Sequence, residues 1–195
     1  MSKIKRAFWL NIRGREMKHI DKLNKLDACG EAVRFAGKFK SGQSAWDNSV
    51  RGDWMLWLVG KTSGKPMSVK RKNLVLCACE CARLALKYVP KGEDRPLKCI
   101  ETAEAWARGD ASYDDLIKAR RAAYDATASA SASASFASFA SFASYAASYA
   151  AYEAAAYAAS AADSAADSAR RDTLKDCADI VRKHYPKVPV VRVEK

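Results

Sequence analysis

From Asp110 to Tyr185 the chain contains neither glycine nor proline, the two residues that most often interrupt a helix. Within this span, residues 122–169 hold 24 Ala, 11 Ser and eight Phe or Tyr. Alanine is the strongest helix former, so most of the span is predicted to be helical. A single helix of these 76 residues would be about 114 Å long. We therefore expect a break, either within residues 129–135 or near Asp163.

Aromatic residues recur every three or four positions in the middle of this segment. On a helix, one stripe spanning an arc of about 140° would contain Phe139, Phe142, Tyr145, Tyr149 and Tyr152. A stripe that faces the protein core is the simpler interpretation. A surface for self-association is the alternative, because exposed aromatic patches are rare on monomers, and on that interpretation the protein is a homo-oligomer.

Charge is unevenly distributed along the chain. The net charge is +12 at pH 7, yet residues 122–169 contain four acids and no Lys or Arg, so the remaining residues carry +16. We distinguish a basic helical body (1–121), an Ala/Ser/aromatic-rich helical segment (122–169) and a basic C-terminal helix and tail (170–195), and expect them to pack as one domain. Such a charge favours an anionic partner. A solvated basic surface is the simpler alternative.

The predicted fold class is all-α: a single-domain helical bundle with long Ala-rich helices. The first expected helices of the body lie within residues 16–40, with Asp27 as a cap, and a short one begins at Ser44. The next covers 54–59, with a cap at Asp53 and a stop at Gly60, and a long one covers 69–89. A helix over 97–108 follows Pro96 and ends at Gly109, and a capping box at Ser112 begins the next. The helix over 69–89 is apolar almost all round, which is typical of a central buried helix. Val188–Val193 follows Pro186, so the tail is predicted to be short and either irregular or strand-like.

Motifs for catalysis are missing from the sequence. It contains no G-x-x-x-x-G-K-[ST] loop, no H-E-x-x-H helix and no G-x-S-x-G turn. There are two histidines, and the six cysteines lack the paired spacing of zinc modules. We interpret the cysteines as buried small hydrophobic residues. The sequence thus predicts a protein that is not an enzyme, with no catalytic residues, no metal and no cofactor.

Arginine and tryptophan occur together at several points of the body. Arginine binds phosphate through two parallel hydrogen bonds, and an aromatic ring can stack on a base. The candidate ligand-binding residues on this basis are Arg51, Trp54, Trp57, Arg71, Arg83, Trp106, Arg108 and Arg120. The simpler alternative is that the tryptophans anchor the core and the cations are solvated.

Several segments resemble a group of phage-encoded, alanine-rich helical proteins. They are CGEA at 29–32, AW at 45–46, RGDWMLWL at 51–58, RKNLVLCACECARLAL at 71–86, PLKCIETAEAWARG at 96–109 and CADIVRKHYP at 177–186. The middle, with CARLAL and ETAEAWARG, is also similar to a bacterial immunity protein domain found beside toxins. The resemblance implies a helical fold, the bacterial host cytosol and a role in biological conflict, and it supplies no catalytic residues.

Three functions fit these observations. The leading hypothesis is a non-catalytic, phage-type counter-defence protein that sequesters an anionic ligand such as a nucleotide immune signal. The alternatives are an immunity-type inhibitor of a toxin or defence enzyme, which binds a host or phage protein, and a basic protein that binds nucleic acid. No uninterrupted apolar run of membrane-spanning length occurs, and the basic start has too short an apolar run for a secretory signal. We therefore expect a cytoplasmic protein without membrane contact.

Overall fold

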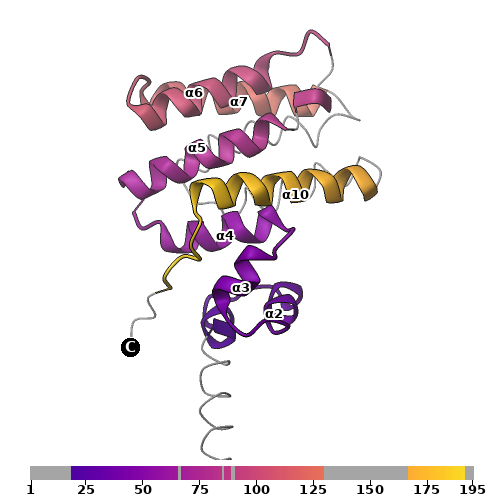
Figure 1. Ribbon diagram of the computed structural model, residues 1–195. Coiled ribbons are helices and arrows are strands. Elements are labelled where there is room, and N and C mark those ends of the chain that lie inside the picture. Colours follow the sequence, from indigo (N-terminus) through magenta and orange to yellow (C-terminus); the bar gives the residue numbers. More distant parts are fainter. Residues whose placement is uncertain (1–18, 66, 85, 89–90, 130–166, 192–195) are drawn as a thin grey trace, which may run out of the picture. The chain divides into compact units, whose positions relative to one another are not determined.

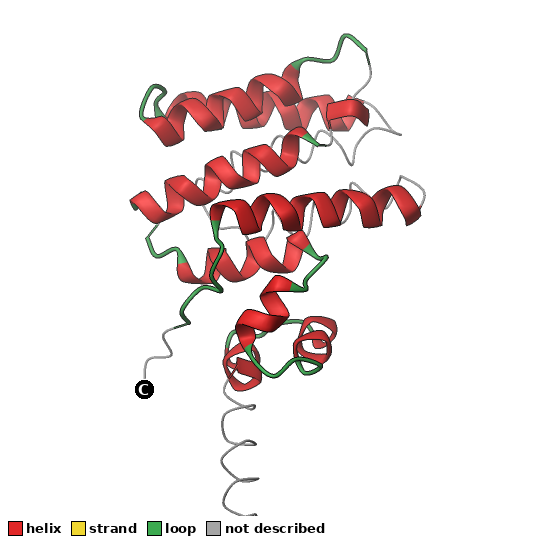
Figure 2. Cartoon of the chain, in the orientation of Figure 1, coloured by secondary structure: helices red, strands yellow, loops and turns green. Residues whose placement is uncertain are grey.

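The structure is a computed structural model that describes residues 19–65, 67–84, 86–88, 91–129 and 167–191 (Figure 1). Within these ranges every regular element is a helix and none is a strand (Figure 2). The all-α fold class is therefore confirmed for this part of the chain, and the tail over 185–191 is irregular. The expected break in the Ala-rich segment and its aromatic stripe lie outside the described residues.

The chain forms two compact units, one comprising residues 1–48 and 190–195 and the other residues 49–189. The first unit contains helical residues 19–25, α2 (Gly30–Ala36) and α3 (Gly42–Asp47). A hydrogen bond of 3.2 Å joins His19 Nε2 to the carbonyl oxygen of Ala36. The hydroxyl of Ser41 accepts a hydrogen bond from the N–H of Ser44 at 3.1 Å and so caps α3. That segments 1–121, 122–169 and 170–195 form one domain stays a prediction.

The second unit is a layered arrangement of helices with α5 in its middle. Its elements are α4 (Gly52–Thr62), α5 (Val69–Arg83), a 3-10 turn (Leu86–Tyr88), α6 (Arg95–Arg108), α7 (Tyr113–Ser129) and α10 (Asp167–His184). On one side, α6 packs against α5 and α7 packs against α6; on the other side, α10 packs against both α5 and α4 (Figure 1). The C-terminal helix thus returns to cover the body.

The central helix α5 is buried on most of its circumference, as its sequence predicts. Four of its residues pack in a cluster with residues of α6 and α7: Val75, Ala78, Cys79 and Ala82. On other faces Leu74, Cys77 and Cys81 are also buried. This burial explains why the helix forms although five of its residues are cysteine or β-branched, because packing outweighs weak intrinsic helix propensity.

A glycine allows α4 and α10 to approach closely. A Cβ atom at Gly52 would lie 2.7 Å from the backbone nitrogen of Ala178 and 2.7 Å from the carbonyl carbon of Cys177. No side chain larger than hydrogen fits there without movement of α10. Close by in the sequence, the carbonyl oxygen of Ser49 accepts a hydrogen bond of 2.6 Å from Arg182 Nη1, which fixes α10 to the start of α4.

Two helix starts differ from the prediction. Asp27 does not cap a helix but has a left-handed φ of 58° in the turn before α2, whose N-cap is Cys29. Asp53 lies inside the first turn of α4, because its carboxylate pairs with Arg51 instead of capping the backbone. The predicted stop at Gly60 was also wrong, since α4 continues to Thr62 through this buried glycine.

The end of α5 differs from the prediction as well, whereas the caps of α6 and α7 are confirmed. The helix ends at Arg83, well before Val89, and a 3-10 turn follows. Gly109 ends α6 with a φ of 99°. The Ser112 hydroxyl accepts a hydrogen bond of 3.1 Å from the N–H of Asp115, whose carboxylate accepts one from the N–H of Ser112, as in a capping box. The Ser112 hydroxyl also donates a hydrogen bond of 2.6 Å to this carboxylate, and that bond, followed by the one from the Ser112 N–H, lowers the pKa of Asp115.

Candidate functional site

The connection between α4 and α5 is organised by Ser68. Its hydroxyl accepts a hydrogen bond from the N–H of Arg71 at 3.3 Å, which caps α5, and donates one to the carbonyl oxygen of Ser63 at 3.0 Å. Gly64 has a φ of 74°, in the left-handed region that favours glycine. The carbonyl of Gly64 is thereby placed against the side chain of Arg71.

Arg71 is a buried cation, and the hydrogen-bond acceptor that the structure shows for it is neutral. Only 7% of the residue is exposed, and Nη2 donates to the carbonyl oxygen of Gly64 at 2.9 Å. Nε and Nη1 are shielded from solvent, and neither has a hydrogen-bond partner in the described part of the chain. A guanidinium has five N–H donors and stays charged at neutral pH. Burying it without a carboxylate therefore costs free energy.

The electrostatic surroundings of Arg71 do not neutralise it. Burial lowers the pKa of Arg71, and the charge of ionised Tyr185, in the tail after α10, is what opposes that shift. Burial also raises the pKa of Tyr185 above its ordinary value of 10.0, so its phenol is neutral at physiological pH. The two groups therefore lie near each other without forming an ion pair.

The residues around Arg71 form a cationic segment. Residues 61–72 contain five cations and no acid, namely Lys61, Lys65, Lys70, Arg71 and Lys72. Of these, Lys61, Lys65 and Lys70 are exposed. Two apolar residues of the same segment, Met67 and Val69, are 61% and 74% exposed. The start of α5 thus offers a buried arginine beneath exposed lysines and apolar side chains.

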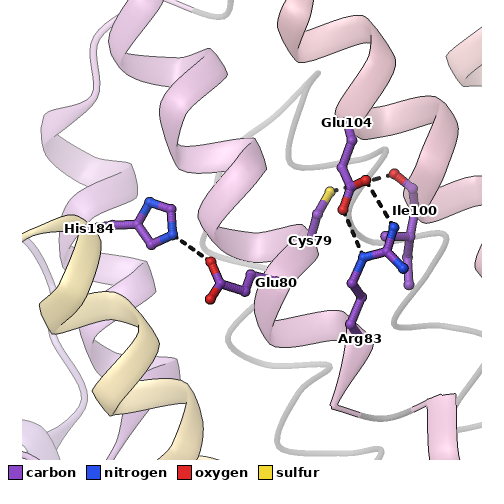
Figure 3. Close-up of polar contacts among 6 residues, drawn as sticks. All are labelled: Cys79, Glu80, Arg83, Ile100, Glu104 and His184. Carbon is purple, nitrogen blue, oxygen red and sulfur yellow. Dashed lines mark hydrogen bonds and ion pairs between the residues drawn. The ribbon is translucent and has the colours of Figure 1, made fainter.

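At the other end of α5, an arginine is fully paired. Arg83 Nε and Nη2 each donate a hydrogen bond of 2.9 Å to the carboxylate of Glu104 on α6 (Figure 3). The hydrogen bond to Glu104 raises the pKa of Arg83. This bidentate pair joins α5 to α6 and leaves Arg83 committed to the fold rather than to a ligand.

The middle of α5 is tied to α10 by a carboxylate. Glu80 Oε2 lies 2.7 Å from His184 Nε2 (Figure 3), and Oε1 lies 3.5 Å from Lys183 Nζ. The hydrogen bond from His184 lowers the pKa of Glu80. Polar contacts of α5 therefore reach the helices on both of its sides.

The buried thiols of Cys79 and Cys81 on α5 are protonated structural groups. Cys81 Sγ donates to the carbonyl oxygen of Cys177 at 3.9 Å, and Cys79 Sγ donates to that of Ile100 at 3.8 Å. Hydrogen bonds with Cys177 and Cys77 raise the pKa of Cys81, and burial raises that of Cys79. Such thiols are poor nucleophiles and poor metal ligands.

The described residues contain neither a cluster of metal ligands nor a membrane-spanning helix. Nowhere among them do three or more His, Cys, Asp or Glu side chains come together in a way that could hold a metal ion. No helix that the structure describes combines the length and apolarity needed to cross a membrane.

The structure brings two of the candidate ligand-binding residues together, Arg51 and Trp54. The guanidinium carbon of Arg51 lies 4.2 Å from the ring centroid of Trp54. Arg51 also binds the buried carboxylate of Asp53, with Nε–Oδ1 and Nη2–Oδ2 distances of 2.8 and 2.5 Å. The guanidinium is thus held between a ring and a carboxylate at the start of α4.

The other two candidate tryptophans are core residues. Trp57 and Trp106 are 9% and 3% exposed. Lys61 Nζ lies 5.6 Å from the ring centroid of Trp57, and Lys72 Nζ lies 5.5 Å from that of Trp106. Burial and these cation–π contacts indicate that both rings anchor the fold.

The remaining candidates lie on α6 and α7. Arg108 is exposed and pairs with Asp110 at 3.3 Å, and Arg120 lies half-buried on α7. The eight candidate residues are thus distributed over α4, α5, α6 and α7, with different contacts. Arg71 alone among them combines burial with donors that lack an acceptor in the described structure.

Sequence reasoning missed the residues that surround Arg71. Ser68 could have been found, because a serine three residues before Arg71 is typical of a helix N-cap. Gly64 and Tyr185 carried no comparable signal, since their role depends on where the loop and the tail after α10 come to lie.

Comparison with known proteins identifies a family. The model for the Imm-5 like putative immunity protein family matches residues 65–188. This range contains Arg71, Arg83 and Tyr185, whereas Arg51 and Trp54 precede it. The resemblance of the middle of the chain to an immunity protein domain is thereby confirmed, and the resemblance to phage-encoded proteins stays a prediction. Neither the curated proteins nor the solved structures contain a match to the chain.

Proposed function

We propose, since the chain belongs to the family of Imm-5 like putative immunity proteins, that it is a non-catalytic protein that neutralises a toxin by binding it. The observation that carries this proposal is the extent of the match, which spans α5, α6, α7 and α10. Polar contacts in that range connect α5 to α6 and to α10, through Arg83–Glu104 and Glu80–His184. A scaffold fixed in this way suits a preformed binding surface.

The charge of the chain bears on the kind of toxin that would bind. Residues 61–72 carry five cations and no acid, and the exposed side chains of Met67 and Val69 lie among them. Charge complementarity accelerates association and suppresses wrong partners. The partner surface would therefore be acidic with apolar patches.

The test is co-expression with the protein encoded by the neighbouring gene, the natural candidate for the toxin. The chain should restore growth of cells that express this protein, and the purified pair should elute together in size-exclusion chromatography. The association rate should fall with rising salt concentration. Continued growth arrest and separate elution, with the chain folded by circular dichroism, would contradict the proposal.

A charge-reversal variant and a matched control locate the surface. Replacing Lys65 and Lys70, which are exposed in the cationic segment, by glutamate should slow association at least tenfold. The same change at Lys22 and Lys25, exposed in the first unit, should leave the association rate within twofold. Equal effects of the two variants would show that net charge, rather than this segment, governs binding.

A second candidate function is capture of an anionic small molecule such as a nucleotide, which would serve counter-defence. The observation that favours it is Arg71, whose Nε and Nη1 lack an acceptor in the described part of the chain. A panel of nucleotides in a thermal-unfolding assay tests it. No shift with any nucleotide would count against this function.

A further inference from the structure

The acceptor of Arg71 differs in charge from the acceptors of five arginines for which the structure shows an ion pair. Each of those binds a carboxylate, in the pairs Arg51–Asp53, Arg83–Glu104, Arg95–Glu93, Arg108–Asp110 and Arg182–Asp179. Arg71 is buried, and the acceptor that the structure shows for it is the neutral carbonyl of Gly64. The more buried cation therefore has the weaker partner.

We propose that Arg71 is the centre of a binding site for the phosphate group of a small molecule, formed with the cationic residues of segment 61–72. The phosphate replaces the carbonyl of Gly64 as the acceptor for the guanidinium. This site lies in the segment that we propose for toxin binding, but phosphate binding does not require the toxin, and the site specifies the ligand class for the second candidate function.

The chemistry of the segment favours phosphate over a carboxylate. A phosphate monoester carries a charge of about −1.5 to −2 at pH 7 and three acceptor oxygens. Arg71 has unused donors on Nε and on Nη1, which can bind more than one oxygen. The exposed lysines nearby, Lys65 and Lys70, lie in a stretch with no acid to offset the charge of an approaching dianion.

The geometry also shows how the ligand would reach the guanidinium. Nε and Nη1 are shielded from solvent, so the side chain must move outward before it binds. One neutral hydrogen bond, from Nη2 to the carbonyl of Gly64, holds it in place. Breaking that bond releases the guanidinium to solvent, and the carbonyl of exposed Gly64 can then bind water. Charge-assisted bonds to phosphate replace a single neutral bond.

The first experiment measures thermal unfolding of the full chain with pyrophosphate, inorganic phosphate or acetate at matched ionic strength. Pyrophosphate at about a hundred times its dissociation constant should raise the unfolding midpoint by roughly 5–10 °C. Inorganic phosphate should act at higher concentration, and acetate should cause no shift beyond that of chloride. A pyrophosphate shift no larger than the acetate shift would overturn the proposal.

Two single substitutions separate the site from general charge effects. Arg71→Met removes the buried guanidinium and should abolish the pyrophosphate shift while the ligand-free protein stays folded. Lys25→Met removes one exposed charge from the first unit, outside segment 61–72, and should keep the shift. If Arg71→Met retains the wild-type shift, the proposal is wrong.

Arg71→Lys keeps the charge without the planar donor set, and it provides a second measurement should Arg71→Met not fold. Calorimetric affinity for pyrophosphate should fall at least tenfold in this variant, and unchanged affinity would contradict the role of the guanidinium. Toxin neutralisation by Arg71→Lys should persist. Pyrophosphate binding tests the phosphate site, and toxin neutralisation tests the proposed function. The failure of one proposal can therefore be distinguished from the failure of the other.

Discussion

The two ends of α5 hold an arginine in opposite ways. At the C-terminal end, Arg83 is 39% exposed and both oxygens of Glu104 accept its hydrogen bonds. At the N-terminal end, Arg71 is 7% exposed, and its observed acceptor is the carbonyl oxygen of Gly64. Stability alone would favour the reverse arrangement, because a charge needs its counter-charge most where water is excluded.

The contrast separates two roles for the same type of residue on one helix. The Arg83 end stabilises the packing of α5 on α6 and leaves the guanidinium little capacity for a ligand. The Arg71 end retains a charge that lowers stability, and groups of this kind occur at binding sites, where function opposes stability. The first turn of α5 is therefore the better candidate for function.

The largest expected effect comes from the position of α10, which carries Tyr185 toward Arg71. Gly52→Ala places a Cβ 2.7 Å from the backbone of α10 and should lower the unfolding free energy by about 1–3 kcal/mol. Hydrogen exchange should increase more in the first turn of α5 than around Arg83, which contacts α6. Denaturant unfolding and exchange mass spectrometry measure both effects.

Gly30→Ala is the matched control for this substitution. The nearest atom to a Cβ there is the flexible end of Arg34, at 3.3 Å. Its unfolding free energy should change by less than about 0.5 kcal/mol. If Gly52→Ala is equally mild, α10 can shift without cost and does not fix the Arg71 end.

The next largest effect is expected at the paired end. Arg83→Met leaves the carboxylate of Glu104, whose side chain is 19% exposed, without its partner. The unfolding free energy should fall by about 1 kcal/mol, because solvent at this half-exposed pair screens the charge that remains. Arg108→Met, at an exposed pair 3.3 Å apart, should cost little in the same denaturant titration. An equal loss of unfolding free energy in the two variants would show that the Arg83–Glu104 pair stabilises the fold no more than an exposed pair does.

The opposite sign is expected at the Arg71 end. Arg71→Met replaces a buried charge by an apolar side chain of similar length, so the unfolding free energy without ligand should stay constant or rise by about 1 kcal/mol. Denaturant unfolding in phosphate-free buffer measures it. A fall larger than that for Arg83→Met would mean that Arg71 stabilises the fold, and the comparison between the two ends would fail.

The smallest effect concerns Glu80, between the two ends. The hydrogen bond from His184 holds its pKa below the ordinary value of 4.5. Its stabilising contribution is therefore fully present above about pH 4.5 and is lost as the pH falls through the lower pKa of the folded state. Because Glu80 is 39% exposed, Glu80→Gln should reduce the loss of unfolding free energy on acidification by only a few tenths of a kcal/mol. Urea unfolding of both proteins at about pH 5 and about pH 3 measures the difference. An equal loss of unfolding free energy in the wild type and in Glu80→Gln would contradict the prediction.

Local sequence signals predicted the parts of the fold that depend on neighbouring residues. The capping box at Ser112, the left-handed Gly109 after α6 and the apolar circumference of α5 all follow from positions a few residues apart. The end of α5 at Arg83 could not be predicted in this way, because the residues beyond it are also good helix formers. Their departure into a 3-10 turn depends on packing.

The candidate site was predictable in its composition and not in its geometry. Arg71 and Arg83 were selected on the same basis, as arginines of a basic body that also contains tryptophan, yet the acceptor of Arg83 is 21 residues away on α6. Only helix register decides which arginine meets a carboxylate. The proximity of Tyr185 to Arg71 likewise depends on the return of α10, more than 100 positions later in the chain.

The cysteines give this chain a natural reporter of its own opening. Cys29 is exposed, whereas Cys77, Cys79, Cys81, Cys99 and Cys177 are buried. An alkylating reagent should therefore modify one thiol within its intrinsic reaction time, and the other five only as fast as α5, α6 and α10 separate. Mass spectrometry of the number of alkylated thiols per molecule would then measure the rate of opening, without an added dye or an engineered label.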